Sequence, residues 1–157
     1  MPNHVTNIVS IKARLDEDEL NYDEEQGKLI SLYKKLHSKE SDFDFNAILP
    51  QPKGIYRGNL SSEDHVKYPI NWYDWNIANW GTKWNAYQVV YLNRVYNEDD
   101  EDKLWLADIL VKFETAWDVP MPVLNKLAEE FDVEFTWNDE GEDVWHEWQK
   151  LTTREDK

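Results

Sequence analysis

Apolar residues alternate with polar ones in four segments of the chain, which is the pattern of β-strands with one buried face. The first strand is expected over residues 3–14, and its inner face carries Val5, Asn7, Val9, Ile11 and Ala13. Because Asn7 shares this face, its amide must find hydrogen-bond partners once the strand is buried.

Three further strands are expected later in the chain, the first of them over residues 84–96. Residues 104–115 alternate most regularly, and their inner positions are Trp105, Ala107, Ile109, Val111 and Phe113. The polar residues 97–103 between these two strands form a connection of hairpin size. The last strand directs inward Val133, Phe135 and Trp137.

Helical periodicity marks three other segments. The first helix is expected over residues 22–37, with its apolar stripe formed by Leu29, Ile30, Leu32, Tyr33 and Leu36. Residues 71–80 predict a short helix that Gly81 ends in a left-handed conformation. A third helix begins near Pro120 with Asp118 as its N-cap, and it buries Leu124, Leu127, Ala128 and Phe131.

This order of elements predicts the α+β class, with a ferredoxin-like βαββαβ antiparallel sheet and two helices on one face. A Trp-rich helical insertion at about residues 43–82 separates the first helix from the second strand. The insertion opens with a strand-like segment at 43–49, and a loop follows over 51–70. We expect a single domain over residues 1–150 and a frayed tail over 151–157.

The charge of the chain restricts its partners. Thirty-two Asp and Glu residues against 17 Lys and Arg residues give a formal net charge of -15. Binding to nucleic acid or to an anionic membrane requires cations, so this balance argues against both. It favours a protein partner with a basic surface, such as a nucleic-acid-binding channel. The alternative is that the charge serves solubility alone.

The chain has no cysteine, which excludes disulfides, thiolate metal sites and iron–sulfur clusters. The start of the chain lacks the basic and apolar regions of a signal peptide. No apolar run approaches the roughly 18–20 residues that span a bilayer. We therefore expect a cytoplasmic protein.

Four segments resemble the YubB-type ferredoxin-like family of phage- and plasmid-encoded proteins. They read MPNHVTN at the start, FDFNAILPQPKG from residue 43, NWYDWNIANWGTKWNAY from residue 71 and FETAWDVPMPVLNKLAEEF from residue 113. The resemblance implies the ferredoxin-like fold and a setting on mobile genetic elements, hence the cytoplasm of a bacterial host cell, and it carries over no catalytic residue. The acidic insertions at 16–25 and 98–102 and the acidic, Trp-rich C-terminal end depart from the family pattern.

Two acidic runs are the first candidate binding sites. They consist of Asp16, Glu17, Asp18 and Glu19, and of Glu98, Asp99, Asp100, Glu101 and Asp102. Both runs fall at the ends of strands or in connections, where carboxylates on a rigid face can imitate a phosphate backbone and occupy a basic groove. The alternative is a solvated face whose charges contact no partner.

The aromatic residues near position 75 are the second candidate. The densest aromatic patch consists of Trp72, Tyr73, Trp75, Trp80, Trp84 and Tyr87. Of these, Trp72, Tyr73 and Trp75 in particular can anchor a protein interface, because Trp and Tyr are frequent hot spots. Alternatively, they form a second small core that holds the insertion onto the sheet. In that arrangement Asn76, Asn79 and Asn85 brace the core by side-chain hydrogen bonds to the backbone.

No catalytic motif is present: the chain lacks GxSxG, HExxH, Walker and GxGxxG patterns. The four histidines, among them His146, show no ligand spacing, so we expect no metal, no cofactor and no enzyme activity. The leading hypothesis is an inhibitor of a host macromolecular complex, for example a CRISPR or restriction complex, that acts by nucleic-acid mimicry. The alternatives are an assembly module that binds through the Trp-rich face and, third, an RNA-binding ferredoxin-like domain.

Overall fold

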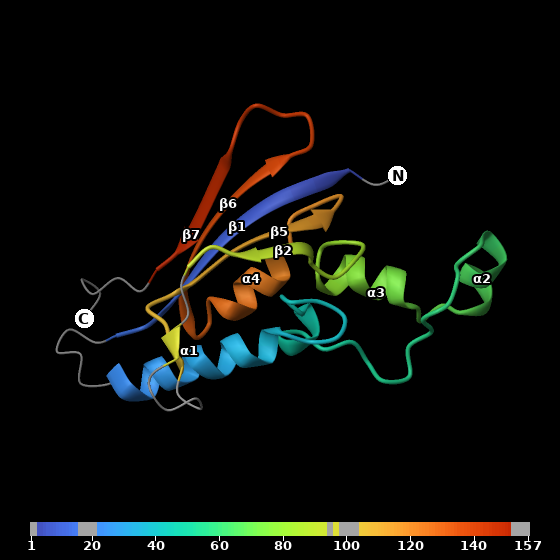
Figure 1. The fold of residues 1–157 in the computed structure, drawn as a ribbon. Helices are drawn as coiled ribbons and strands as arrows, with labels where there is room; N and C mark the ends of the chain where they lie inside the picture. The colour runs from blue at the N-terminus through green and yellow to red at the C-terminus, as the bar shows by residue number, and fades with distance from the viewer. Residues whose placement is uncertain (1–2, 16–21, 94–95, 98–103, 152–157) are drawn as a thin grey trace.

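The computed structural model describes residues 3–15, 22–93, 96–97 and 104–151. Its central feature is a five-stranded antiparallel sheet with the strand order β2-β5-β1-β6-β7 (Figure 1). These strands are β1 (His4–Ala13), β2 (Tyr87–Tyr91), β5 (Ile109–Ala116), β6 (Phe131–Asp139) and β7 (His146–Lys150). The short strands β3 (Tyr96–Asn97) and β4 (Leu104–Trp105) pair separately. The expected α+β class is confirmed.

The helices are α1 (Tyr22–Leu36), the 3-10 helix η1 (Phe45–Ala47), α2 (Ser62–Lys67), α3 (Trp72–Asn79) and α4 (Met121–Leu127). Figure 1 shows α1 and α4 on the same side of the sheet. Their buried side chains share one core with the inner residues of β1 and β5. Within the described residues no helix has the length and apolar character needed to cross a bilayer.

Strand β1 occupies the middle of the sheet and pairs with β5 on one side and β6 on the other. Its inner face is fully buried at the expected positions Val5, Asn7, Val9 and Ile11. The Nδ2 of Asn7 donates to the carbonyl of Val5 (3.1 Å), the carbonyl of Phe113 (3.3 Å) and the hydroxyl of Thr115 (3.0 Å). The amide donors therefore find partners, as the sequence requires.

The segment at 43–49 was expected to be strand-like, and this prediction is wrong. Asp44 accepts a hydrogen bond from the backbone N–H of Asn46 and caps the 3-10 helix η1. Phe43 and Phe45 are fully buried on either side of this cap, and Phe43 stacks on Phe113 with 4.7 Å between ring centroids. Asp44 between them is also buried, so the alternation of apolar and polar residues in this segment does not correspond to a strand with one buried face.

The strand expected over 104–115 is interrupted before Ile109. Leu106 is fully buried and Ala107 is exposed, the reverse of the predicted alternation. The side-chain amide of Gln26 in α1 donates to the carbonyl of Leu106, which takes the place of a strand partner. The strand expected over 84–96 is also shorter than predicted: β2 covers Tyr87–Tyr91, and its register with β5 shifts between Tyr87 and Val90.

Two local predictions, the loop at 51–70 and the N-cap at Asp118, are wrong because the helices there are capped differently from what was expected. The predicted loop at 51–70 contains α2, which Ser61 and Asp64 begin with reciprocal side-chain to backbone hydrogen bonds. Asp118 does not cap α4: its Oδ1 accepts from the N–H of Val119 (2.8 Å), and Pro120 occupies the N-cap position. Most of the expected frayed tail, residues 152–157, lies outside the described residues.

The end of α3 confirms the predicted role of Gly81, which has φ +81°. A Cβ at this position would lie 3.1 Å from the backbone oxygen of Val119 and 3.1 Å from Cδ of Pro122. The turn after α3 therefore sits directly on the turn that begins α4, and a side chain does not fit between them.

Asn7→Ala should lower the free energy of unfolding by about 2–3 kcal/mol, because buried backbone and hydroxyl acceptors lose their donor. Ser10→Ala on the open face of the same strand is the control, and it should change stability by about 0.5 kcal/mol or less. Urea denaturation of the three proteins measures both values. Equal effects of the two substitutions would contradict the structural role given to Asn7.

Gly81→Ala should destabilise the protein by about 1–2 kcal/mol, because alanine disfavours the left-handed conformation and its Cβ meets a fixed carbonyl. The matched control is Gly54→Ala, where an added Cβ has no neighbour within 4 Å in the described residues. Thermal and urea unfolding measure the difference. A Gly81 variant as stable as the Gly54 variant would disprove the tight contact between the two turns.

The raised pKa values of two tyrosines in β2, Tyr87 and Tyr91, lead us to expect a loss of stability at alkaline pH. Burial, followed by the nearby Glu114 and Glu140, raises the pKa of Tyr87 to about 12. Burial also raises the pKa of Tyr91, whose hydroxyl donates to the carbonyl of Asp42 (2.8 Å). A tyrosine in the unfolded chain ionises near pH 10, so the unfolded state releases these protons first.

The free energy of unfolding should therefore fall as the pH rises from about 10 to about 12. The Tyr87→Phe/Tyr91→Phe variant should show a shallower decline over this interval, with its stability at pH 7 as the baseline. Urea titrations at a series of pH values measure both curves. Parallel curves would mean that these hydroxyl groups do not control the alkaline decline.

Candidate functional site

The β6–β7 hairpin, residues 131–150, concentrates negative charge. Seven of its residues are acidic and one is a lysine, so its formal charge is seven minus one, or six negative charges. The acidic residues are Asp132, Glu134, Asp139, Glu140, Glu142, Asp143 and Glu147. Strand β7 lies near the C-terminal end of the described residues. It was not predicted as a strand, because its alternation becomes clear only beside β6.

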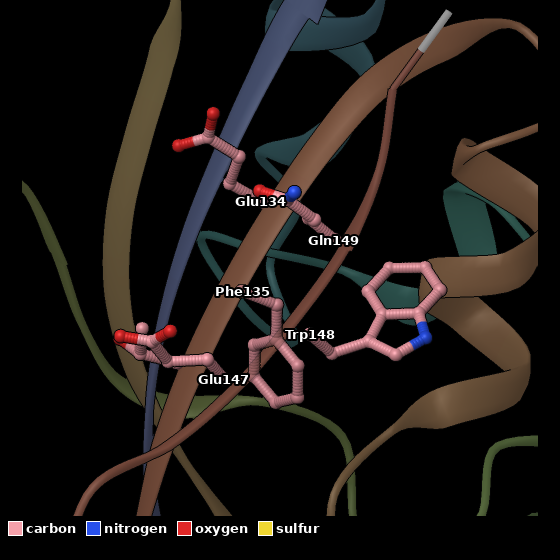
Figure 2. Close-up of a pocket in the computed structure, with 6 residues that line it drawn as sticks. Glu134, Phe135, Glu147, Trp148 and Gln149 are labelled. Atoms are coloured by element: carbon pink, nitrogen blue, oxygen red, sulfur yellow. The ribbon is translucent and has the colours of Figure 1, made fainter.

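The pairing of β6 with β7 sorts their side chains onto two faces. Thr136 pairs with Glu147 and Glu134 pairs with Gln149, which gives an acidic and polar face. Phe135 pairs with Trp148 on the opposite face. Figure 2 shows the rings of Phe135 and Trp148 pointing away from the carboxylates of Glu134 and Glu147.

The same residues border an open hollow of about 410 Å³. Glu134, Glu147 and Gln149 are exposed, whereas Trp148 is half-buried and packs against the core. Glu134 and Glu147 have no ion-pair partner among the residues that the structure describes. Their charges are therefore available to a partner.

The aromatic face of the hairpin continues toward its turn. Trp137 stacks on Phe135 with 4.9 Å between ring centroids, and His146 stacks on Trp137 at 5.2 Å. At the turn itself Val144 is 60% exposed and Trp145 is 47% exposed. The exposed apolar side chains of Val144 and Trp145 thus follow the acidic residues Glu142 and Asp143 in the turn.

Asp139, Glu142 and His146 gather at the base of this turn, with one potential ligand atom of each within 4.8 Å of the others. Carboxylate and imidazole ligands suit a divalent transition-metal ion, and the spacing of three and four residues across a turn is the signal in the sequence. His146 Nε2 lies 3.1 Å from Glu142 Oε2, so the groups also satisfy one another. All three are at least partly open to solvent, and we assign them no role.

The acidic runs Asp16, Glu17, Asp18 and Glu19, and Glu98, Asp99, Asp100, Glu101 and Asp102, lie outside the described residues. Their proposed contact with a basic surface therefore stays a prediction. The acidic hairpin 131–150 carries the same kind of charge on described residues, and it was not among the candidate sites predicted from the sequence.

The structure divides the predicted aromatic candidates. Trp75 contacts Trp80 at 5.5 Å between ring centroids, and Trp80 is 1% exposed within the core. Trp72 donates from Nε1 to the carbonyl of Gly58 (2.8 Å). Tyr73 and Trp84 belong to a second group of rings, which also includes Trp117 and was not predicted.

That group surrounds the amine of Lys83. The Nζ lies 4.8 Å from the ring centroid of Trp84, 5.0 Å from Trp117 and 5.9 Å from Tyr73. Trp84 and Trp117 are 38% and 42% exposed, and Trp117 has φ +78°, a conformation unusual for a bulky residue. We call Tyr73, Lys83, Trp84 and Trp117 the Lys83 cluster.

The expected asparagine braces hold this region to the core. Asn76 donates from Nδ2 to the carbonyl of Lys83 (2.9 Å), and Asn79 donates to the carbonyl of Trp75 (2.9 Å). Asn85 accepts through Oδ1 from the N–H of Phe45 (2.8 Å). The backbone that presents the Lys83 cluster is thus fixed from several sides.

Comparison with known families gives one finding. Residues 91–146 match the model of a family described as the ferredoxin-like domain in Api92-like protein. Neither the curated proteins nor the solved structures gave a match. The match runs from the end of β2 to the start of β7, and it supports a ferredoxin-like family for this chain.

Proposed function

We propose that this protein binds a basic surface of another macromolecule through its acidic hairpin 131–150 and thereby blocks that surface. The observation that carries the proposal is the excess of six negative charges on the hairpin 131–150, strands and turn together, beside an exposed apolar tip at Val144 and Trp145. Rim charges speed encounter and exposed aromatic residues anchor the contact.

The proposed scaffold is a ferredoxin-like βαββαβ unit made of β1, α1, β2, β5, α4 and β6. The antiparallel order β2-β5-β1-β6 supports this topology, and β7 is an added edge strand. The segment between α1 and β2, with η1, α2 and α3, is the proposed insertion. The resemblance to phage- and plasmid-encoded proteins suggests that the partner belongs to a host complex.

A rigid strand pair is suited to blocking a nucleic-acid-binding channel. Exposed carboxylates along β6 and β7 offer lysine and arginine side chains the charge that phosphates would offer. Such contacts weaken with salt, since the Debye length shortens from about 10 Å at 0.1 M to about 3 Å at 1 M. A CRISPR or restriction complex of the host is the proposed class of target.

A second candidate function is an assembly module that binds through the Lys83 cluster. The exposed rings of Trp84 and Trp117 favour it. Binding there would depend on ring contacts, so salt would change it little. Direct RNA binding has less support: the outer positions Thr6 and Ile8 of β1 and Leu110 and Lys112 of β5 are not aromatic, and stacking on this face needs rings.

The test is capture of partners from a bacterial lysate by the tagged protein, with elution along a salt gradient and identification by mass spectrometry. The Glu134→Lys/Glu147→Lys variant should lose about tenfold or more of the captured partner, because each reversal converts an attraction into a repulsion. The matched control is Asp42→Lys/Glu63→Lys, which changes the net charge equally at exposed positions away from the hairpin.

Capture that the control retains and the hairpin variant loses, with release at moderate salt, supports the proposed function. Equal loss in both variants would assign the effect to net charge rather than to the hairpin. A partner that resists salt and is lost on Trp84→Ala would favour the Lys83 cluster instead. Circular dichroism confirms that each variant remains folded.

A further inference from the structure

We infer that β7 is a docking edge to which an extended segment of the partner adds as a further strand, with lysine or arginine alternating with apolar residues. This inference rests on the proposed function and specifies how the acidic hairpin 131–150 recognises its partner. The partner is identified by this chemistry alone: a β-strand that is basic on one face and apolar on the other.

The position of β7 supplies the backbone part of the site. It ends the strand order β2-β5-β1-β6-β7, and within the described residues it pairs with β6 alone. Alternate N–H and C=O groups of such a strand point outward and can form a ladder with an added strand. Its register with β6 is regular over all five pairs, from Val133–Lys150 to Trp137–His146.

The opposite edge of the sheet is less suited to this role. Strand β2 shifts register between Tyr87 and Val90, and Gln88 between them has φ +52°. Irregularities of this kind twist an edge away from further pairing. The sheet therefore has one irregular edge and one regular edge, and the regular edge carries the acidic residues.

The side chains of β6 and β7 define what an added strand must carry. Such a strand would lie about 4.8 Å from β7, with its side chains alternating between the two faces. On one face they would meet Glu147 and Gln149, with Glu134 behind them. Lysine or arginine fits this face by charge complementarity.

On the other face the added strand would meet Trp148 and His146. Trp148 packs against the core yet remains half-buried, so part of its ring is open to a partner. Figure 2 shows this ring directed away from the glutamates. Valine, isoleucine or an aromatic residue would cover it, and cross-strand pairs of this kind stabilise a sheet by about 0.2–1 kcal/mol each.

A second copy of the chain is a poorer occupant of the edge. Each copy carries a formal net charge of -15, so two acidic hairpins would be brought together against mutual repulsion. A basic strand instead neutralises the carboxylates of Glu134 and Glu147. Self-pairing is therefore treated as a competing outcome of the experiment.

The experiment uses the full chain and three synthetic peptides of equal lysine and valine content. The first alternates lysine with valine. The second has its lysines in one block. The third repeats the alternating sequence with every second backbone nitrogen methylated, which removes the donors along one edge. Titrations monitored by NMR report the amide shifts and hydrogen-exchange protection of residues 146–150, and calorimetry reports affinity.

The alternating peptide should bind about tenfold more tightly than the methylated peptide, a factor that one or two lost hydrogen bonds account for. It should also bind more tightly than the block peptide, which presents lysine and valine on both faces of the added strand. It should also slow exchange at β7, and Glu134→Lys/Glu147→Lys should abolish its binding. The Asp42→Lys/Glu63→Lys control should retain it.

Equal affinity of the three peptides would overturn strand addition and leave the charge-based proposed function standing. Failure of all three to bind, or binding that protects residues away from β7, would also overturn the inference. If protection of β7 appears on raising the protein concentration without peptide, and ultracentrifugation shows a dimer, the occupant is a second copy and the inference is wrong.

Discussion

The whole structure depends on the burial of one face of β1. This strand pairs with β5 and β6 at once, so its inner residues Val5, Val9 and Ile11 are fixed by two ladders and are fully buried. A slip of one residue in either ladder would turn the apolar face to solvent. The two halves of the sheet therefore keep a common register, and α1 and α4 have a single apolar surface on which to pack.

Asn7 sharpens that constraint. It lies among the apolar residues of β1, and its Nδ2 donates hydrogen bonds to the carbonyl of Phe113 and the hydroxyl of Thr115 in β5. A different register between β1 and β5 would leave this amide buried without those partners, at a cost of about 1–3 kcal/mol. One polar residue in the core thus favours the observed register of β1 and β5 over registers shifted by one or two residues.

The parts of the fold that follow from local periodicity were predictable. Strand β1 and helix α1 repeat their apolar positions within a single element, and Gly81 ends α3 through its own backbone preference. The segment at 43–49 and the break before Ile109 were not predictable in this way. There the burial of Phe43 and Leu106 is decided by Asp44 and by Gln26 of α1, which are contacts of a turn and of a distant helix.

The candidate sites likewise combine features that the sequence predicts with features that depend on long-range contacts. The excess of acidic residues is visible in the composition, but their placement on one hairpin depends on the pairing of β6 with β7. The Lys83 cluster joins Tyr73, Trp84 and Trp117, which lie in three separate segments of the chain. The Trp-rich segment therefore indicated Tyr73 and Trp84, whereas no local pattern placed Trp117 beside them.

The two surfaces differ in whether their charge is already satisfied. In the Lys83 cluster the ring faces attract a cation, and the protein's own Lys83 occupies that position. A cation from a partner would have to displace it or bind the outer ring surfaces. On the hairpin, Glu134 and Glu147 have no ion-pair partner within the described part of the chain, and the aromatic residues beneath them supply the packing that holds the strands together. Unsatisfied charge on a well-packed edge is the combination that a basic partner can exploit, which is why the hairpin is the stronger of the two candidates.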